Sequence, residues 1–263
     1  MSEGQYIIAE GYTIYHSAQR YIIPKRGVFM LSAIILAAGS SSRMGGVNKQ
    51  FLELGGVPVL VRSVQAFLWE GEAEEILVVC RREDWDAVDG LVGHLPKVRV
   101  VPAGGETRQQ SVENALRYLY PLCDRIAIHD GARPLVRPED IGKTVAAGEE
   151  TGAAVLGVMA KDTIKVVEKG RVISTPDRSG LFVTQTPQVF DLARYREALS
   201  AAKEAGADLT DDGQLFERMG WPVAAVIGHY DNIKITTPED LPAAEAMLAL
   251  QPEWEMETEE EAF

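Results

Sequence analysis

Two cations that follow a small polar loop near the start of the chain could bind phosphate. Residues 34–38 are apolar, residues 39–42 are Gly-Ser-Ser-Ser, and Arg43 and Lys49 come soon after. Unpaired backbone N–H groups in such a loop can face anionic oxygens, and the cations can neutralise the remaining charge. The alternative is an ordinary connection between a strand and a helix with two solvated charges. The loop alone does not decide between them.

Two further polar segments also follow apolar runs. Residues 103–106 are Ala-Gly-Gly-Glu, and Ser111 lies in the first turn of the helix expected next. Residues 129–134 are His-Asp-Gly-Ala-Arg-Pro. The sequence has no obvious Ser-His-Asp or Cys-His combination, so we interpret His129 as structural and Arg133 as the partner of an ion pair.

The elements that must position these residues alternate between strand and helix. Continuous apolar runs predict four buried strands, and apolar residues at helical spacing predict helices between them. We expect the strands at 34–38, 76–80, 98–101 and 126–128. This alternation is typical of an α/β fold with a mainly parallel sheet that helices cover on both faces. Ligands of such sheets bind beyond the carboxyl ends of the strands, and all three polar segments lie there.

The pattern changes after residue 150. Short strand-like runs around a Lys169-Gly170 turn predict a β-rich insertion with an antiparallel arm at about 159–180. We expect Thr186-Pro187-Gln188 to end this β-rich part. The remaining expectations are a helix capped by Thr210, strands at 223–227 and 233–236, and a last helix whose first position is Pro238.

Composition divides the chain into three parts. Residues 1–29 lack the pattern of a signal peptide and form an N-terminal extension with no assigned function. Residues 30–250 form a single domain, and residues 251–263 form an acidic C-terminal tail. The net charge is −13, and six glutamates lie in that tail. An acidic balance argues against nucleic acid as a partner, but a small phosphorylated substrate needs only a few local cations.

The cysteines and the apolar runs indicate the compartment. Cys80 and Cys123 are the only two cysteines, and their spacing fits no metal motif. We therefore predict buried free thiols in a reducing compartment and a cytoplasmic protein. No apolar run approaches the roughly 20 residues that span a bilayer, so we expect no membrane partner.

Eight segments occur in an order that resembles a known enzyme family. They are AAGSSSRM followed by Lys49, GGETRQQSV, HDGARP, KDTIK, DRSGL, TQTPQVF, LTDD and DNIKIT. Over about residues 32–249 the chain resembles the 2-C-methyl-D-erythritol 4-phosphate cytidylyltransferases of the non-mevalonate isoprenoid pathway. The first loop alone is similar to that of many nucleotidyltransferases. HDGARP followed by DNIKIT is much more specific.

This resemblance implies a Rossmann-like fold, a homodimer formed through the β-arm, Mg²⁺ or another divalent cation, and the substrates CTP and 2-C-methyl-D-erythritol 4-phosphate. The positions that match CTP contacts are Ala37, Ala38, Gly39, Arg43, Lys49, Gly105, Glu106, Ser111, Asp130 and Ala132. Asp130 also matches a position near the metal, which CTP phosphates would mainly hold. The positions that match acceptor contacts are Thr163, Arg178, Thr186, Thr210 and Lys234. Thr163 and Arg178 would serve the partner's site. Glu106 and Gly131 stand where the family often has Asp and Ala.

The implied chemistry explains why these residue types suffice. A phosphate monoester has its second pKa near ~6, so the acceptor phosphate is largely dianionic at neutral pH and needs no general base. Catalysis must instead bring two anions together and stabilise charge on the α-phosphate of CTP. Arg43 and Lys49 are the expected catalytic cations.

Each assignment has a plainer alternative. The cations could be surface charges, Asp130 a cap, Ser111 an ordinary helix residue, Arg178 a turn residue, and Thr163 and Thr186 residues chosen for β-propensity. The arm could be a simple surface hairpin. Alternative functions are a cytidylyltransferase for another polyol phosphate, such as ribitol 5-phosphate, and a nucleotide-binding protein without catalysis. A sugar-nucleotide pyrophosphorylase would share the first loop but not DNIKIT.

Overall fold

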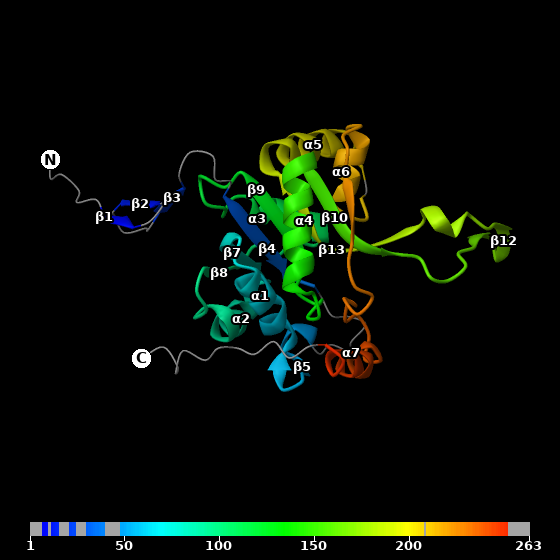
Figure 1. Ribbon diagram of the computed structural model, residues 1–263, viewed down its shortest axis with the longest axis horizontal. Helices are drawn as coiled ribbons and strands as arrows, with labels where there is room; N and C mark the ends of the chain where they lie inside the picture. Colours follow the sequence, from blue (N-terminus) through cyan, green and yellow to red (C-terminus); the bar gives the residue numbers. More distant parts are fainter. Residues whose placement is uncertain are drawn as a thin grey trace.

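A seven-stranded sheet forms the centre of the part of the chain that the structure describes. The computed structural model describes residues 30–39, 48–207 and 209–251, together with the strands β1 (Ile7–Ala9), β2 (Tyr12–Tyr15) and β3 (Tyr21–Pro24). The order across the large sheet is β14-β10-β13-β9-β4-β7-β8. Its strands are β4 (Leu31–Leu36), β7 (Ala73–Val79), β8 (Val98–Val101), β9 (Arg125–Asp130), β10 (Ala153–Met159), β13 (Phe182–Asp191) and β14 (Ala224–Ile227) (Figure 1).

The predicted mainly parallel sheet is confirmed. Strands β4, β7, β8 and β9 are parallel to their neighbours in this group, and β10 is parallel to β14. Within the described sheet, β13 alone runs in the opposite direction, antiparallel to both β10 and β9. The carboxyl ends of β4, β7, β8 and β9 therefore meet at one edge, which is the edge where the polar segments were expected.

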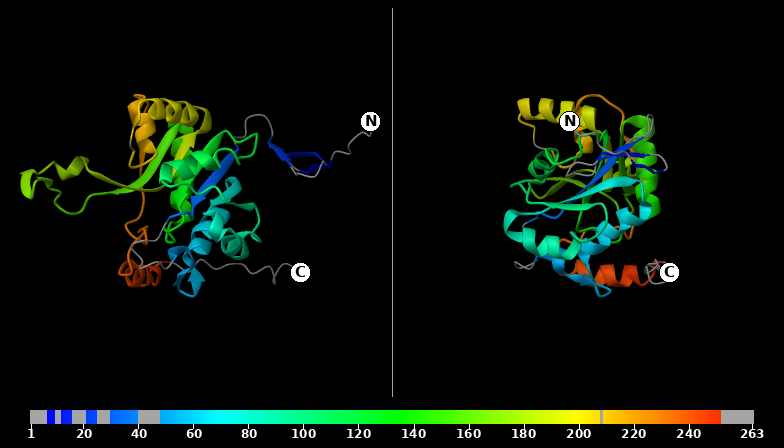
Figure 2. Two further views of the ribbon diagram at one scale, coloured as in Figure 1. Left: turned by 180° about the vertical axis from the view of Figure 1, so that it is seen from behind. Right: turned by 90° about the vertical axis from the view of Figure 1, so that its left-hand side faces the viewer.

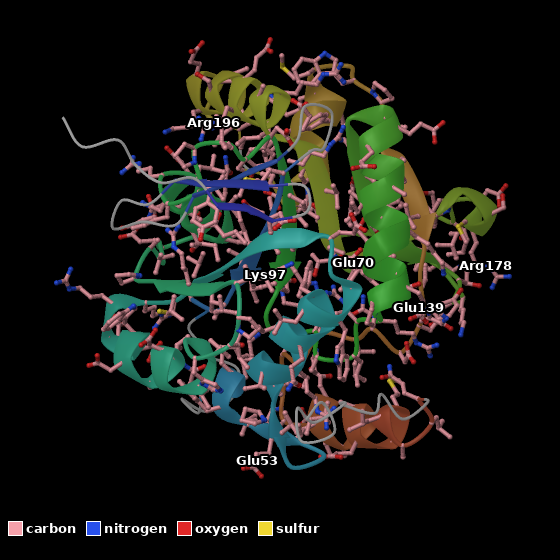
Figure 3. All side chains as sticks on the ribbon, turned by 60° about the vertical axis from the view of Figure 1, so that its left-hand side comes forward. Glu53, Glu70, Lys97, Glu139, Arg178 and Arg196 are labelled. Carbon is pink, nitrogen blue, oxygen red and sulfur yellow. The ribbon has the colours of Figure 1, made fainter. Side chains whose placement is uncertain are left out.

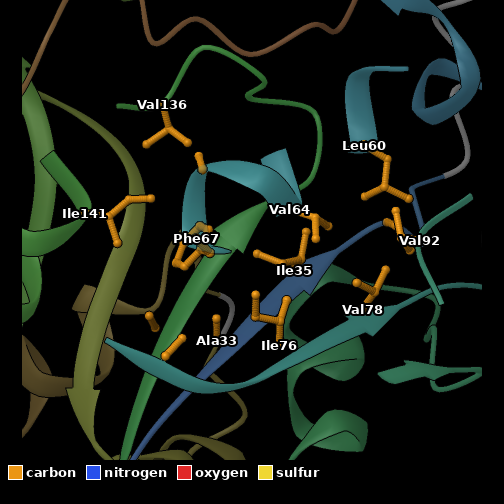
Figure 4. Close-up of a cluster of buried hydrophobic side chains, with 14 of the residues drawn as sticks. Ala33, Ile35, Leu60, Val64, Phe67, Ile76, Val78, Val92, Val136 and Ile141 are labelled. Atoms are coloured by element: carbon orange, nitrogen blue, oxygen red, sulfur yellow. The ribbon is translucent and has the colours of Figure 1, made fainter. Parts of the chain in front are cut away.

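Helices cover both faces of the sheet. Helices α1, α2 and α4 pack on one face, and α3, α5 and α6 pack on the other. Neighbouring strand residues alternate between the two layers: Ile35 of β4 lies in one apolar cluster with Phe67 and Ile141 (Figure 4), and Ile34 lies in the cluster on the opposite face. The helices are α1 (Val59–Glu70), α2 (Trp85–Val92), α3 (Arg108–Ala115), α4 (Pro138–Thr151), α5 (Leu192–Glu204), α6 (Gly213–Arg218) and α7 (Asp240–Leu248).

The Thr186-Pro187-Gln188 segment does not end the β-rich part, so that prediction was wrong. It lies inside β13, and Gln188 is paired with Val155 of β10 and Ile128 of β9. The register between β10 and β13 shifts between these pairs and the pair Gly157 and Thr184. Pro187 lies within this irregularity, where its missing N–H interrupts no regular ladder.

Three boundaries in the last third of the chain also differ from the predictions. Residues 233–236 form no strand in the structure; they cross the strand ends, and Ile235 N–H donates to Ala132 O (2.8 Å). The last helix begins at Asp240, because the Asp240 carboxylate accepts the N–H groups of Thr236 and Thr237. Asp211, not Thr210, accepts the Gln214 N–H at the start of α6.

A β-hairpin projects from the sheet at the predicted position of the arm. It consists of β11 (Val166–Glu168) and β12 (Arg171–Ser174), and Lys169 and Gly170 form its turn with φ values of 46° and 76°. The left panel of Figure 2 shows the hairpin well away from the helices. Val167 and Val172 are 56% and 61% exposed. A single chain thus leaves apolar side chains of the arm in solvent.

The predicted free thiols are confirmed for both cysteines. Cys80 and Cys123 are buried and unbonded, and burial raises the pKa of Cys80 to about 12 and that of Cys123 to about 11. Neither thiol is therefore a nucleophile at neutral pH. Among the described residues, no helix has the length and apolar character needed to cross a membrane.

Candidate active site

A cavity of about 630 Å³ opens where β4, β7, β8 and β9 end. Residues from all the polar segments line it, which confirms that the fold brings these segments together. The predicted residues in its walls are Ala38, Gly39, Lys49, Gly105, Glu106, Ser111, Asp130, Ala132 and Lys234. Ala37 lies behind this wall, because it is buried and its N–H donates to Val79 O (2.8 Å). Arg43 lies outside the described residues.

The loops after β4 and β8 touch each other, and only a small residue fits between them. Gly104 N–H donates to Cys80 O (2.8 Å), and a Cβ atom on Gly104 would lie 2.7 Å from the Ala38 Cβ. Arg81 strengthens this junction, since its Nε donates to Ala38 O (3.0 Å). The close approach explains the glycine at this position and fixes the floor of the cavity.

The loop after β8 uses its own backbone donors internally. Gly105 N–H donates to Ser111 Oγ (2.9 Å), the Ser111 hydroxyl donates to Thr107 O (3.0 Å), and Glu106 N–H donates to Gln110 Oε1 (2.7 Å). Ser111 thus shapes the loop, whatever contact it also makes with a ligand. Gly104, Gly105 and Glu106 of this loop line the cavity.

Lys49 enters the cavity from the short 3-10 helix η2 (Lys49–Phe51). The Asn48 side chain caps this helix by accepting Gln50 N–H (3.1 Å). The Lys49 Nζ donates to Ile235 O (3.0 Å), so the crossing segment 233–236 positions the ammonium group. Lys49 and Lys234 therefore reach the same cavity from opposite ends of the sequence.

Three cations surround the carboxylate of Asp130 at the end of β9. Lys234 Nζ lies 2.8 Å from Oδ2, Arg108 Nε lies 3.3 Å from Oδ1, and Arg133 Nε lies 3.7 Å from Oδ2. Burial alone would raise the pKa of Asp130, but the charges of Arg108, Lys234 and Arg133 outweigh it and hold that pKa below its ordinary value. Asp130 is therefore ionised, and it gathers positive charge at the mouth of the cavity.

A second cavity, of about 350 Å³, adjoins the first. Arg108, Asp130 and Lys234 line both cavities, so they form the junction between them. Two predicted acceptor residues, Thr186 and Thr210, also line the second cavity. Its remaining walls are polar: Arg133, Thr184, Gln185, Gln188, Asp211, Gln214 and Glu217.

Arg108 is fixed at this junction from both sides. Besides Asp130 it forms an ion pair with Asp212, which is only 3% exposed and accepts the Tyr195 hydroxyl (2.7 Å). Burial opposes the charge of Arg108, yet Asp212 and Asp130 keep its pKa above the ordinary value. Three cations, Arg108, Arg133 and Lys234, thus gather around the carboxylates of Asp130 and Asp212 where the two cavities meet.

His129 lies under the second cavity, fully buried, and it has the structural role that the sequence predicted. Its ring packs edge-on against Phe67 (5.2 Å between centroids), and burial lowers its pKa to about 3. Nδ1 lies 3.1 Å from Thr186 Oγ1 and Nε2 lies 3.3 Å from Arg133 O. The ring is neutral at physiological pH and holds two neighbours of the site in place.

The two remaining predicted residues are not brought to either cavity in this chain. Thr163 is exposed on the arm, and Arg178, in η4 (Arg178–Gly180), donates to Lys161 O. Figure 3 labels Arg178 at the periphery of the molecule, on the side where the arm leaves the sheet. Their service to a partner's site stays a prediction.

Sequence reasoning missed several residues that the structure places in the walls of the site. Arg108 and Asp212 were passed over, and Arg133 was assigned an ion pair only. Arg133 does pair with Asp130, and it also donates to Asn232 O (2.7 Å) and lines the second cavity. A signal was available, since these residues lie inside the quoted segments GGETRQQSV, LTDD and HDGARP. Their side-chain directions were not readable there.

Comparison with known proteins identifies the family. The family model of 2-C-methyl-D-erythritol 4-phosphate cytidylyltransferase (IspD) matches residues 31–250, a range that includes every wall of both cavities. The chain belongs to this family. The enzyme of that name from Geobacillus kaustophilus is 46% identical over 220 residues, which cover 82% of this chain and 96% of the relative. The enzyme from Syntrophotalea carbinolica is 46% identical over 225 residues, which cover 82% and 94%.

Solved structures of family members share the fold. The 4-diphosphocytidyl-2C-methyl-D-erythritol synthase of Anaerococcus prevotii superimposes with a TM-score of 0.77 and 34% identity, covering 84% of this chain and 96% of that one. The cytidylyltransferase of Thermus thermophilus has a TM-score of 0.67 and 31% identity, covering 82% and 98%. The sheet and both cavities lie within this cytidylyltransferase fold, and the strands β1–β3 precede the matched range.

Proposed function

We propose that the protein transfers the cytidylyl group of CTP to 2-C-methyl-D-erythritol 4-phosphate, giving 4-diphosphocytidyl-2-C-methyl-D-erythritol and pyrophosphate. Family membership supports this reaction, and one structural observation carries the mechanism. Two adjoining cavities share Arg108, Asp130 and Lys234, so two anionic substrates can meet at a cationic junction. The larger cavity would take CTP, and the smaller polar one would take the acceptor.

The reaction needs positioning and charge, not a proton acceptor. An oxygen of the acceptor phosphate attacks the α-phosphorus of CTP, a new P–O bond forms, and the bond to the β-phosphate breaks to release pyrophosphate. The attacking phosphate is already dianionic for the most part, because its second pKa is near ~6. Lys234 would orient it, and Lys49 and Arg43 would stabilise the charge that develops on the α-phosphate.

A divalent cation, Mg²⁺ by expectation, would accompany the triphosphate. The donor set fits an ion carried by phosphate oxygens and water: no cluster of three His, Cys, Asp or Glu side chains suited to a metal occurs among the described residues. The Asp130 carboxylate already has three cationic partners, so it could contribute at most one ligand. When bound, the ion would neutralise phosphate charge.

The arm would complete the acceptor site of a second subunit. Its exposed valines and isoleucines would suit a partner surface, and Thr163 and Arg178 line neither of the two cavities described in their own chain. We therefore propose a homodimer in which each arm reaches the partner's acceptor cavity. Mixing Lys49→Ala and Arg178→Ala chains tests this at an acceptor concentration well below KM: a heterodimer regains one complete site only if Arg178 acts across the interface. The mixture should then turn over faster than the two separate variants together, and equal rates would mean that Arg178 does not act in this way.

The decisive assay follows pyrophosphate release with CTP, Mg²⁺ and a panel of acceptors. We expect turnover with 2-C-methyl-D-erythritol 4-phosphate and much less with ribitol 5-phosphate. Preference for ribitol 5-phosphate would reassign the acceptor. Binding of CTP without turnover on any acceptor would indicate a non-catalytic nucleotide-binding protein.

Two further assignments complete the proposal. The catalytic domain would comprise residues 30–250, with residues 1–29 as an extension and 251–263 as an acidic tail. A cytoplasmic location is supported by the two buried free thiols, which suit a reducing compartment.

A further inference from the structure

The hydroxyl group of Thr186 has two partners inside the protein although it lines the second cavity. Thr186 lies on β13 close to the end of β9, where the Asp130 N–H donates to Thr186 Oγ1 (3.0 Å). The same oxygen lies 3.1 Å from Nδ1 of His129. Thr186 is only 4% exposed, so these two contacts decide how the hydroxyl is oriented.

The direction of the second hydrogen bond follows from the partner of the other ring nitrogen. Nε2 of His129 faces Arg133 O (3.3 Å), and a carbonyl oxygen can only accept. Nε2 therefore carries the proton of the neutral ring, and Nδ1 is left as an acceptor. The ring is fully buried and packs on Phe67, and its two hydrogen-bond partners are neutral, so a charged ring would be costly. Thr186 must then donate its hydroxyl proton to Nδ1.

These contacts leave one lone pair on Thr186 Oγ1 and no proton. We propose that Thr186 is an acceptor-only group which binds a hydroxyl of the polyol and not its phosphate, and that His129 is the positioning residue that imposes this polarity. The proposal rests on the proposed function, because the polyol phosphate must occupy the second cavity. It makes Thr186 a determinant of acceptor specificity.

The charged residues of the second cavity agree with a phosphate that lies away from Thr186 and a polyol hydroxyl that lies against it. A phosphate oxygen is itself an acceptor, so a hydroxyl that has already given its proton to His129 would repel it. Arg133 and Lys234 line the same cavity and supply donors for the phosphate. The polyol would thus lie with its phosphate at the cationic junction and one hydroxyl toward Thr186.

The first experiment measures the tautomer of His129. In protein labelled with ¹⁵N-histidine, the ring resonances are assigned by substituting the other three histidines one at a time. We expect a protonated Nε2 and an unprotonated Nδ1 at neutral pH, and a shift of the Nδ1 resonance in Thr186→Val. A protonated Nδ1 would overturn the proposal, because Thr186 could then donate to the substrate.

The second experiment compares Thr186→Val with the wild type on the natural acceptor and on analogues that each lack one hydroxyl. On the natural acceptor we expect kcat/KM to fall about tenfold, the effect of one hydrogen bond of roughly 1.4 kcal/mol, with the KM for CTP unchanged. On one deoxy analogue the variant and the wild type should be equal. If kcat/KM of Thr186→Val stayed below that of the wild type on every analogue, Thr186 would not contact a hydroxyl of the polyol.

Two control variants distinguish the loss of a substrate contact from the general effect of removing a buried hydroxyl. Thr144→Val removes an equally buried threonine hydroxyl, which donates to Asp140 O on α4 outside both cavities, and should leave every KM unchanged. Thr186→Ser should retain the wild-type preference among the analogues. If the wild type releases no pyrophosphate on any acceptor, the proposed function fails, and the tautomer measurement still decides the polarity of Thr186. The tautomer of His129 in the wild-type protein also decides the polarity of Thr186 if Thr186→Val does not fold.

Discussion

The two cavities of the site are built in different ways. The floor of the larger one is formed by loop backbone and small residues after parallel strands, with Gly104 packed against Ala38 and Cys80. The smaller one is formed by side chains in a network of charges and hydrogen bonds around Asp130, Asp212 and His129. Loop backbone at a strand end follows from local sequence, whereas such a network exists only after distant segments have come together. The nucleotide half is thus a property of the sheet topology, and the acceptor half is a property of tertiary contacts.

The largest effect is expected from the cation of the nucleotide cavity. Lys49→Ala should lower kcat by about 10²–10³, the usual cost of losing one group that stabilises charge in the transition state. The fold should persist, because Lys49 is only partly buried on a short helix. Pyrophosphate release and thermal unfolding measure the two quantities, and we predict the same loss for Arg43→Ala.

Lys203→Ala is the matched control for this change, since Lys203 of α5 forms a surface ion pair with Glu113 of α3 (2.6 Å) and lines neither cavity. It should leave turnover unchanged. If Lys49→Ala released pyrophosphate at the wild-type rate, Lys49 would be a surface charge.

The next effect tests whether the acceptor half depends on its charge network. Asp212→Asn removes the charge of a buried partner of Arg108 and should lower the free energy of unfolding by about 3 kcal/mol. Tyr195→Phe removes only the hydroxyl that donates to Asp212 and should cost about 1 kcal/mol. Denaturant unfolding measures both. Equal costs would mean that the charge of Asp212 adds nothing to the network.

The same contrast explains how far sequence could predict this site. The positions of Ala38, Lys49, Gly105 and Asp130 were predictable, because each follows a strand of a parallel sheet and all such ends share one edge. The roles of Arg108, Arg133 and Asp212 were not, because an arginine in a polar segment shows no direction for its guanidinium. Only the fold brings Asp212 to Arg108, 104 residues away in sequence.

The wrong boundaries have the same origin. Thr186-Pro187-Gln188 was expected to end the β-rich part, and proline is indeed unusual inside regular ladders. The register shift of β13 against β10 accommodates it, and no local pattern announces that shift. Residues 233–236 have strand-like composition, yet they cross the strand ends because Ile235 bonds to Ala132 and its carbonyl receives Lys49.

A smaller effect should change the binding of one substrate and leave the other unchanged. Arg178→Ala should raise the KM for the polyol phosphate about tenfold, the loss expected for one charge-assisted hydrogen bond of roughly 1.5 kcal/mol, and leave the KM for CTP unchanged. Steady-state kinetics with each substrate varied in turn measures both constants. A change in the CTP constant alone would place Arg178 at the nucleotide half.

The last effect concerns pH, and it tests the buried ring beneath the acceptor half. The pKa of His129 is lowered from 6.5 to about 3 in the folded protein by burial. Between these values the unfolded chain binds a proton that the folded chain excludes, so the contribution of His129 is complete above about pH 6.5 and falls as the pH is lowered. The slope from this one group is about 1.4 kcal/mol per pH unit.

The test is the free energy of unfolding between about pH 6.5 and 4.5, above the range where unfolded Asp side chains titrate. His129→Gln keeps an N–H for Arg133 O but has no titrating ring. In His129→Gln the free energy of unfolding should depend less on pH than in the wild type, by about that slope. Identical slopes in the two proteins would show that His129 is not held neutral beneath Thr186.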